Sequence, residues 1–153
     1  MTGKTNPVGK ETLDRFNGVN ATAWSDPVYV NLLTAGPSSD GEPGSYPTNY
    51  VEWEMARVPV YRSTTSASEP RWSSVQKDSA APGKVYISNQ HVVSWGEISG
   101  VGTAVTVTHI AVFTTAGAAS GNLLYWDELD VSRTVNDGDT FQFGVNKLKI
   151  RED

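Results

Sequence analysis

The sequence contains no cysteine among its 153 residues. This absence excludes disulfide bonds, thiolate catalysis and zinc sites built on cysteine. No apolar run approaches the roughly 18–20 residues that a membrane-spanning helix needs. The first residues also lack the apolar stretch of a signal peptide. We therefore expect a soluble protein that is made in a cytoplasm and has no membrane partner.

Basic residues are too few and too scattered to form a nucleic-acid surface. Lysine and arginine together number 12, aspartate and glutamate number 17, and the formal net charge is −5. Proteins that follow a phosphate backbone concentrate their cations on one face. We therefore expect no nucleic-acid partner.

The sequence also lacks the arrangements that nucleophilic enzymes use. Serine and threonine are abundant, but no Gly-x-Ser-x-Gly elbow is present, and the two histidines, His91 and His109, are unpaired in sequence. We expect no enzymatic activity.

The remaining metal-binding residue types have simpler explanations. His109 lies in an alternating apolar segment, so we expect a hydrogen-bonded, half-buried strand residue. A metal on an oligomer axis is the alternative. The acidic clusters at 127–130 and 137–139 favour a solvated surface, with a calcium site as the alternative. We expect no metal and no cofactor.

Turn-forming and β-branched residues dominate what is present. Segments 27–34, 50–61 and 104–114 are rich in Val, Ile, Thr and aromatic residues, and polar Gly/Pro/Ser loops separate them. Segment 104–114 is apolar on both faces towards its C-terminal half, which predicts a central strand. The pattern predicts an all-β protein: a single antiparallel β-sandwich or barrel-like domain of roughly 8–10 short strands.

The N-terminal segment differs from the rest. Residues 1–10 are polar and predict a flexible arm. Residues 11–18 predict a short helix, because Leu13 and Phe16 share a helical face and Gly18 can end it. The β domain is expected to span 11–153.

The C-terminal segment carries two local signals. The Asp137-Gly138 pair is typical of a two-residue hairpin turn between strands. After it, apolar residues alternate from Phe141 to Val145 and then change phase, which predicts a bulge near Asn146.

In this order, the segments resemble a family of small tailed-phage virion proteins described as tail-fibre or head-associated structural proteins. The shared pattern covers roughly residues 11–150. Its motifs are Tyr29-Val30-Asn31-Leu32-Leu33-Thr34-Ala35, Met55-Ala56-Arg57-Val58, Trp95-Gly96-Glu97, Val107-Thr108-His109-Ile110-Ala111-Val112-Phe113, Gly121-Asn122-Leu123-Leu124-Tyr125-Trp126, Leu129, Thr134-Val135 and Gly138-Asp139-Thr140. The resemblance implies a structural protein of the virion, assembled in the host cytoplasm.

Two positions in the virion remain open. The favoured one is a capsid decoration (cement) protein that binds the outside of the head shell as an oligomer, with a trimer favoured and the major capsid protein as partner. Small size, an arm and long loops fit this role. The alternative is a tail-fibre, collar or tail-tip component involved in host attachment. Against it, no internal repeat is present.

Aromatic residues and arginines in loops are the expected anchors for subunit contacts, because interfaces are enriched in them and burial within one subunit is harder to arrange there. The arm and the short helix are expected to add contacts. The interface candidates are Pro7, Leu13, Phe16, Trp53, Arg57, Arg71 and Trp72. A sugar-binding platform of aromatic rings is the competing interpretation.

Overall fold

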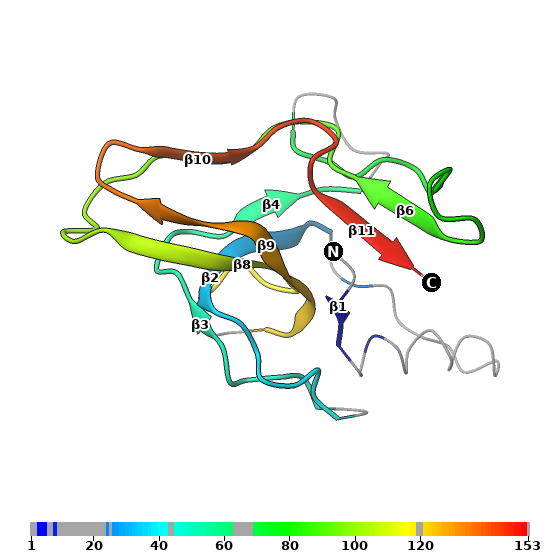
Figure 1. Ribbon diagram of the computed structural model, residues 1–153, viewed down its shortest axis with the longest axis horizontal. Coiled ribbons are helices and arrows are strands. Elements are labelled where there is room, and N and C mark those ends of the chain that lie inside the picture. Colours follow the sequence, from blue (N-terminus) through cyan, green and yellow to red (C-terminus); the bar gives the residue numbers. More distant parts are fainter. Residues whose placement is uncertain are drawn as a thin grey trace.

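The computed structural model describes residues 3–5, 8, 24, 26–42, 45–62, 69–118 and 121–152. The elements in this part of the chain are all strands, which confirms the predicted all-β class (Figure 1). They are β1 (Gly3–Lys4), β2 (Val28–Ala35), β3 (Val51–Glu52), β4 (Val58–Val60), β5 (Gln76–Lys77), β6 (Val85–Ser88), β7 (Val93–Glu97), β8 (Val105–Phe113), β9 (Leu123–Val135), β10 (Thr140–Phe143) and β11 (Lys149–Glu152). Within the described residues, no helix has the length and apolar character that crossing a bilayer would require.

Parts of the predicted N-terminal organisation lie outside the described residues. These are the predicted helix at 11–18 and the interface candidates Pro7, Leu13 and Phe16. Within the predicted arm, β1 pairs with β9, and the Thr5 amide donates to the Leu124 carbonyl at 3.1 Å. Val8 is buried in the main core. In the structure, this part of the arm therefore packs against its own chain.

The largest sheet has six strands in the order β1-β9-β8-β2-β3, with β4 also paired to β2. All its pairings are antiparallel, and β8 lies at its centre between β9 and β2. The predicted central position of this segment is confirmed. The order has two ends, so this sheet does not close into a barrel.

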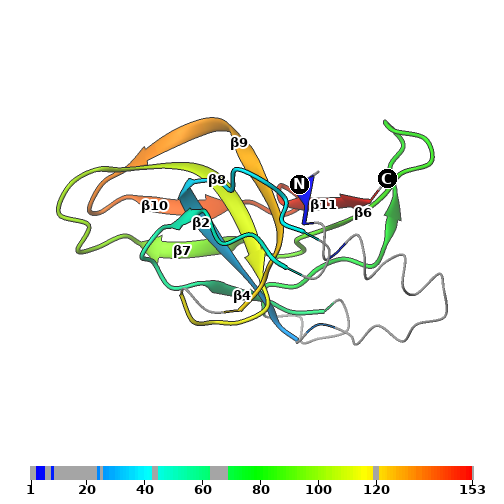
Figure 2. The same ribbon diagram turned by 90° about the horizontal axis from the view of Figure 1, so that it is seen from below.

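Two smaller sheets complete the fold. One pairs β10 with β7, and the other has the order β11-β6-β5. Figures 1 and 2 place them at opposite ends of the long axis of the molecule. The small sheets combine segments 76–97 and 140–152. The last two strands, β10 and β11, therefore pair with β7 and β6, which lie much earlier in the sequence.

The main hydrophobic core draws side chains from all three sheets. Val30 and Leu32 come from β2, Val112 from β8, Trp95 from β7 and Ile150 from β11. Burying an aliphatic side chain of this size stabilises the fold by about 1.5–3 kcal/mol. The core therefore holds the small sheets to the large one.

A second, smaller cluster explains why β8 is apolar on both faces. Ala111 and Phe113 pack there with Leu33 and Leu123, whereas Ile110 and Val112 belong to the main core. Successive residues of a strand point to opposite faces. The centre of β8 is therefore covered on both sides.

Two predictions about the C-terminal segment are wrong in detail. Asp137-Gly138 does form a turn, with Gly138 at φ 86°, but β9 and β10 on either side belong to different sheets. The turn is anchored instead on a neighbouring loop, since the Gly138 amide donates to the Ile98 carbonyl at 2.8 Å. An Asp-Gly pair favours a positive φ and a reversal of the chain. It does not determine which strand the following segment pairs with.

The change of apolar phase after Phe143 comes from a turn rather than a bulge. Residues 144–148 separate β10 from β11, which belong to different sheets, and Asn146 lies in the turn at φ 61°. A turn and a bulge both reverse the alternation of inward and outward side chains, so the sequence pattern did not distinguish them.

The Asp137-Gly138 turn gives a pH-dependent prediction. The backbone amide and side-chain amide of Asn136 donate to Asp139 Oδ2 at 2.8 and 3.1 Å and lower the pKa of that carboxyl below its ordinary value of 3.8. A lowered folded-state pKa stabilises the protein above the unfolded-state pKa, and this contribution is lost as pH falls through the folded-state value. We expect the difference in urea midpoint between wild type and Asp139→Asn to shrink as pH falls from about 5 to about 2. A difference that stays constant over this range, or an equal effect from the exposed β9 variant Asp130→Asn, would contradict the assignment.

Candidate functional site

The four described interface candidates have different environments. Trp53 and Trp72 are buried in the main core, with only 4% and 6% of their surface exposed. Aromatic residues in or beside loops were expected to be harder to bury within one subunit, but the structure buries both within this chain. The cause is backbone pairing: Trp53 directly follows β3 and its amide donates to the Leu32 carbonyl at 3.0 Å, and Trp72 forms an isolated antiparallel bridge with Asn89. As single-chain core residues, they present almost no surface to a partner or to a sugar.

Arg57 lies in a buried ion pair. Its Nε and Nη2 donate to the two carboxylate oxygens of Glu52, each at 2.7 Å, and its Nη1 donates to the Thr115 carbonyl at 2.8 Å. The guanidinium also stacks on Phe113, 3.7 Å from the ring centroid. The exposed fractions of the two charged side chains are 0% and 9%. This geometry binds β3 to β8 within the chain.

The Arg57–Glu52 ion pair is part of a larger hydrogen-bond network and affects the pKa of Tyr50. Asn31 donates to Glu52 Oε1 at 2.7 Å and accepts from the Trp95 indole at 3.0 Å, so the network links β2, β3 and β7. Burial and, secondarily, the Glu52 carboxylate raise the pKa of Tyr50 above its ordinary value of 10.0, while Arg57 acts in the opposite direction. The network is a structural element of the fold.

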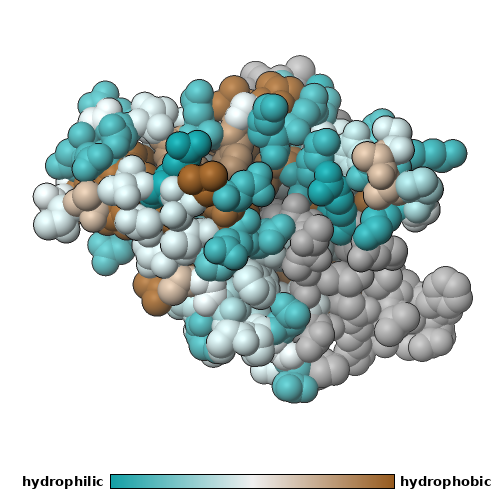
Figure 3. Space-filling view, in the orientation of Figure 1, coloured by the Kyte–Doolittle hydropathy of each residue, from teal (hydrophilic) through white to brown (hydrophobic). Residues whose placement is uncertain are grey.

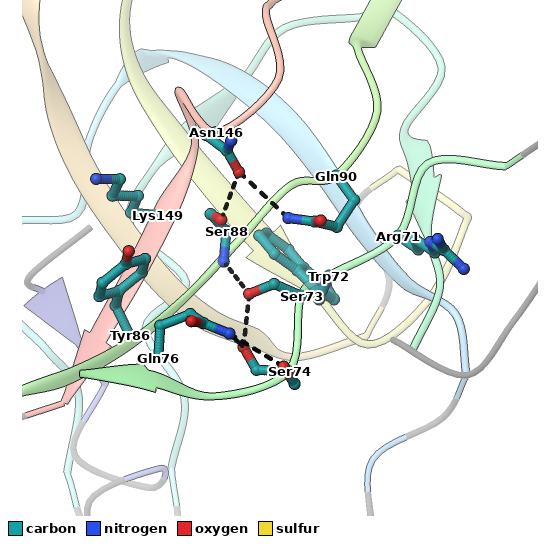
Figure 4. Close-up of a pocket in the computed structure, with 10 residues that line it drawn as sticks. All are labelled: Arg71, Trp72, Ser73, Ser74, Gln76, Tyr86, Ser88, Gln90, Asn146 and Lys149. Atoms are coloured by element: carbon teal, nitrogen blue, oxygen red, sulfur yellow. Dashed lines mark hydrogen bonds between the residues drawn. The ribbon is translucent and has the colours of Figure 1, made fainter. Parts of the chain in front are cut away.

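Arg71 lines a groove of about 670 Å³, and the buried Trp72 forms part of its wall (Figure 4). Its walls are the segment 71–76, strand β6 with the residues that follow it, and the start of β11 with the turn before it. The lining is three serines, two glutamines, one asparagine, one arginine, one lysine and two aromatic residues: Ser73, Ser74, Ser88, Gln76, Gln90, Asn146, Arg71, Lys149, Trp72 and Tyr86. No carboxylate is among these ten residues.

Hydrogen bonds hold the polar side chains of the groove in place. Asn146 Oδ1 accepts from Ser88 Oγ at 2.9 Å and from Gln90 Nε2 at 3.2 Å. The Ser73 hydroxyl accepts from the Ser88 amide at 3.1 Å and donates to the Ser74 carbonyl at 2.7 Å. Figure 4 shows these bonds as a chain from Asn146 down to Gln76. Side chains fixed in this way present defined donors and acceptors.

Asn89 fixes the turn that carries Asn146. It is fully buried, and its Nδ2 donates to the carbonyls of His91 and Gly144 at 2.7 and 2.9 Å. Its Oδ1 accepts from the Leu148 amide at 2.8 Å, and its own carbonyl accepts from the Asn146 amide at 2.8 Å. The side chain and the backbone of Asn89 together hold segment 89–91 to residues 144–148.

The two cations of the groove stand at its ends. Lys149 Nζ lies 4.8 Å from the centroid of the Tyr86 ring, and Figure 4 shows Arg71 on the far side of Trp72 from this pair. The groove therefore has a positive lining in a chain whose net charge is −5.

Apolar surface gives no comparable feature on the face drawn in Figure 3. That face is mostly hydrophilic, with hydrophobic residues in small groups. Large hydrophobic residues that are exposed lie on separate segments, among them Val51, Val75, Val92 and Val131. Single exposed valines are normal on a protein surface.

His109 has the environment predicted for it. It is half-buried in β8, its Nδ1 is 2.7 Å from Thr108 Oγ1, and its ring centroid lies 5.8 Å from that of Trp126. The acidic residues at 127–130 lie along β9. Over the described ranges, no group of three or more His, Asp or Glu side chains could hold a metal ion.

Sequence reasoning found only Arg71 and Trp72 of the groove, and it assigned them to a protein interface. The missed residues come from segments 73–76, 86–90 and 146–149, which are far apart in the chain. Ser73-Ser74 and Asn146 read as loop residues, and nothing in their spacing indicates that they meet. One local feature could have indicated the turn beneath the groove: Asn89, a polar residue that directly follows strand β6.

The model of the family described as "Podophage GP4 fiber I protein gp80" matches residues 4–151, nearly the whole chain. No curated protein matches the chain.

Proposed function

The chain belongs to the podophage GP4 fiber I protein gp80 family, and from this membership we propose that it is a tail-fibre component through which the phage particle engages its host. The family confirms the predicted resemblance to phage structural proteins and makes the chain a component of the virion. The match over residues 4–151 is the observation that carries the proposal.

Membership of a fibre-protein family changes which of the two proposed locations in the virion is favoured. The sequence favoured a cement protein on the head shell, with the major capsid protein as partner. The family is one of fibre proteins, so the match supports the alternative, a fibre component in host attachment, better than capsid decoration. We propose other tail proteins and further copies of this chain, with a trimer favoured, as its partners in the particle.

The layer arrangement suits a non-enzymatic attachment module. We propose an antiparallel β-sandwich, because the main core lies between the six-stranded sheet and the two smaller sheets. Rigid sheets of this kind hold loops and turns in fixed positions, where binding residues are commonly found. The groove is built from such a turn and from strand ends.

Gold labelling of purified virions tests the proposal. An antibody raised against this chain and visualised by electron microscopy is expected to place gold particles on the tail. Pre-immune serum is the control for non-specific label. Label on the head shell, with none on the tail, would overturn the tail-fibre assignment and restore the decoration hypothesis.

A further inference from the structure

We propose that the groove lined by Arg71, Tyr86, Gln90, Asn146 and Lys149 binds an acidic saccharide, a polyhydroxylated ligand that carries carboxylate or phosphate groups. This inference rests on the proposed function only in that a fibre meets the host surface. The groove chemistry is argued from its own residues, and its volume of about 670 Å³ lies in the range of about 300–1,000 Å³ typical of ligand pockets.

The lining selects a ligand that can exchange hydrogen bonds. Serine hydroxyls and the amides of Gln76, Gln90 and Asn146 supply both donors and acceptors along the groove. An apolar ligand would cover these groups without satisfying them, which costs free energy. Hydroxyl groups repeated along a sugar chain match such a lining.

The charge of the lining selects an anionic ligand. Arg71 and Lys149 stand at the two ends, and none of the ten lining residues is acidic. Arginine binds carboxylate and phosphate groups with two parallel hydrogen bonds, and lysine binds them as a point charge. A ligand with acidic groups separated by neutral hydroxylated units fits this order of charges.

The groove is already ordered before a ligand arrives. Asn146 Oδ1 is held by Ser88 and Gln90, which directs the Asn146 amide nitrogen away from these bonds (Figure 4). Asn89 fixes the turn beneath it. A preorganised site loses less conformational entropy on binding, so even a few hydrogen bonds can give measurable affinity.

Two charge-changing variants separate this proposal from simple folding effects. Asn146→Asp keeps the acceptor oxygen for Ser88 and Gln90 but places a carboxylate in the groove. Lys149→Gln removes one cation. Arg133→Gln, at an exposed position of β9, changes the net charge by the same amount away from the groove and is the matched control.

The experiment is calorimetric titration of the purified full chain. The ligands are oligogalacturonate, its carboxyl-reduced neutral form, a phosphorylated lipopolysaccharide core oligosaccharide and its dephosphorylated form. A polyglutamate peptide and a single-stranded DNA oligonucleotide test the other polyanions. We expect at least one acidic saccharide to bind more tightly than its neutral form. Asn146→Asp and Lys149→Gln should weaken it about tenfold to a hundredfold, as loss of a charge-assisted hydrogen bond does, and Arg133→Gln should leave it unchanged.

Three results would overturn the proposal: no binding of any saccharide, equal binding by wild type and Asn146→Asp, or peptide or DNA binding as tight as saccharide binding. The two acidic saccharides distinguish carboxylate from phosphate as the recognised group. The titration is independent of the labelling of virions. Tail label without saccharide binding would therefore reject this inference alone, and saccharide binding with shell label would reject the tail-fibre assignment alone.

Discussion

Replacing Arg57 with methionine is expected to lower the free energy of unfolding by about 3–5 kcal/mol, because it leaves the Glu52 carboxylate buried without its counter-ion. Only 9% of the Glu52 side chain is exposed. Its two oxygens accept from Arg57 at 2.7 Å each, and Oε1 also accepts from Asn31 at 2.7 Å. Urea unfolding followed by tryptophan fluorescence measures the change.

The double variant Glu52→Gln/Arg57→Met makes this prediction specific. Removing both charges abolishes the unpaired carboxylate, and replacement of a buried ion pair by neutral groups is often nearly neutral for stability. We expect the double variant to recover most of the loss. Arg133→Met, at an exposed position of β9, controls for loss of a surface arginine and should change stability by less than about 0.5 kcal/mol. A double variant as unstable as Arg57→Met would show that the ion pair is not the cause.

Asn89→Asp is expected to cost about 3 kcal/mol, although the two side chains have almost the same shape. The carboxylate can still accept from the Leu148 amide, but it cannot donate to the carbonyls of His91 and Gly144. The Gly144 carbonyl keeps a bond from the Lys147 amide at 3.1 Å, so the cost comes from losing two side-chain donor bonds and from burying a charged carboxylate. Each buried polar group that loses its partner costs about 1–3 kcal/mol. For a chain of this size, the loss corresponds to a fall in melting temperature of about 6–12 °C.

The melting temperature from calorimetry tests this second prediction, with Asn122→Asp as the matched control in an exposed turn. The control should melt within about 2 °C of wild type. A shift for Asn89→Asp no larger than that of the control would mean that the turn at 144–148 does not depend on this side chain.

The all-β class and the central strand were predictable because they depend on local periodicity. β8 is apolar on both faces, and the structure covers it on both faces with two separate clusters. The pairing of strands was not predictable. Asp137-Gly138 specifies a turn, yet the strand after it pairs with β7, which was made more than forty residues earlier. Which strands pair depends on long-range packing in the core, and local sequence patterns do not reveal that packing.

Burial was misjudged for residues in irregular segments. Trp53 and Trp72 were expected in or beside loops, and interfaces are enriched in tryptophan and arginine, so these two residues and Arg57 were predicted to anchor a protein interface. In the structure, Arg57 is matched to Glu52, and both tryptophans enter the main core. The groove could not be predicted for a similar reason, because its three segments are brought together by the pairing of β11 with β6.

A reconstruction of intact virions by cryo-electron microscopy, at a resolution that separates strands, tests the central claim most directly. Fitting the chain is expected to place its copies in the tail, as an oligomer, with the groove between Arg71 and Lys149 open to the exterior. Copies of the chain bound to the outside of the head shell, with none in the tail, would contradict it.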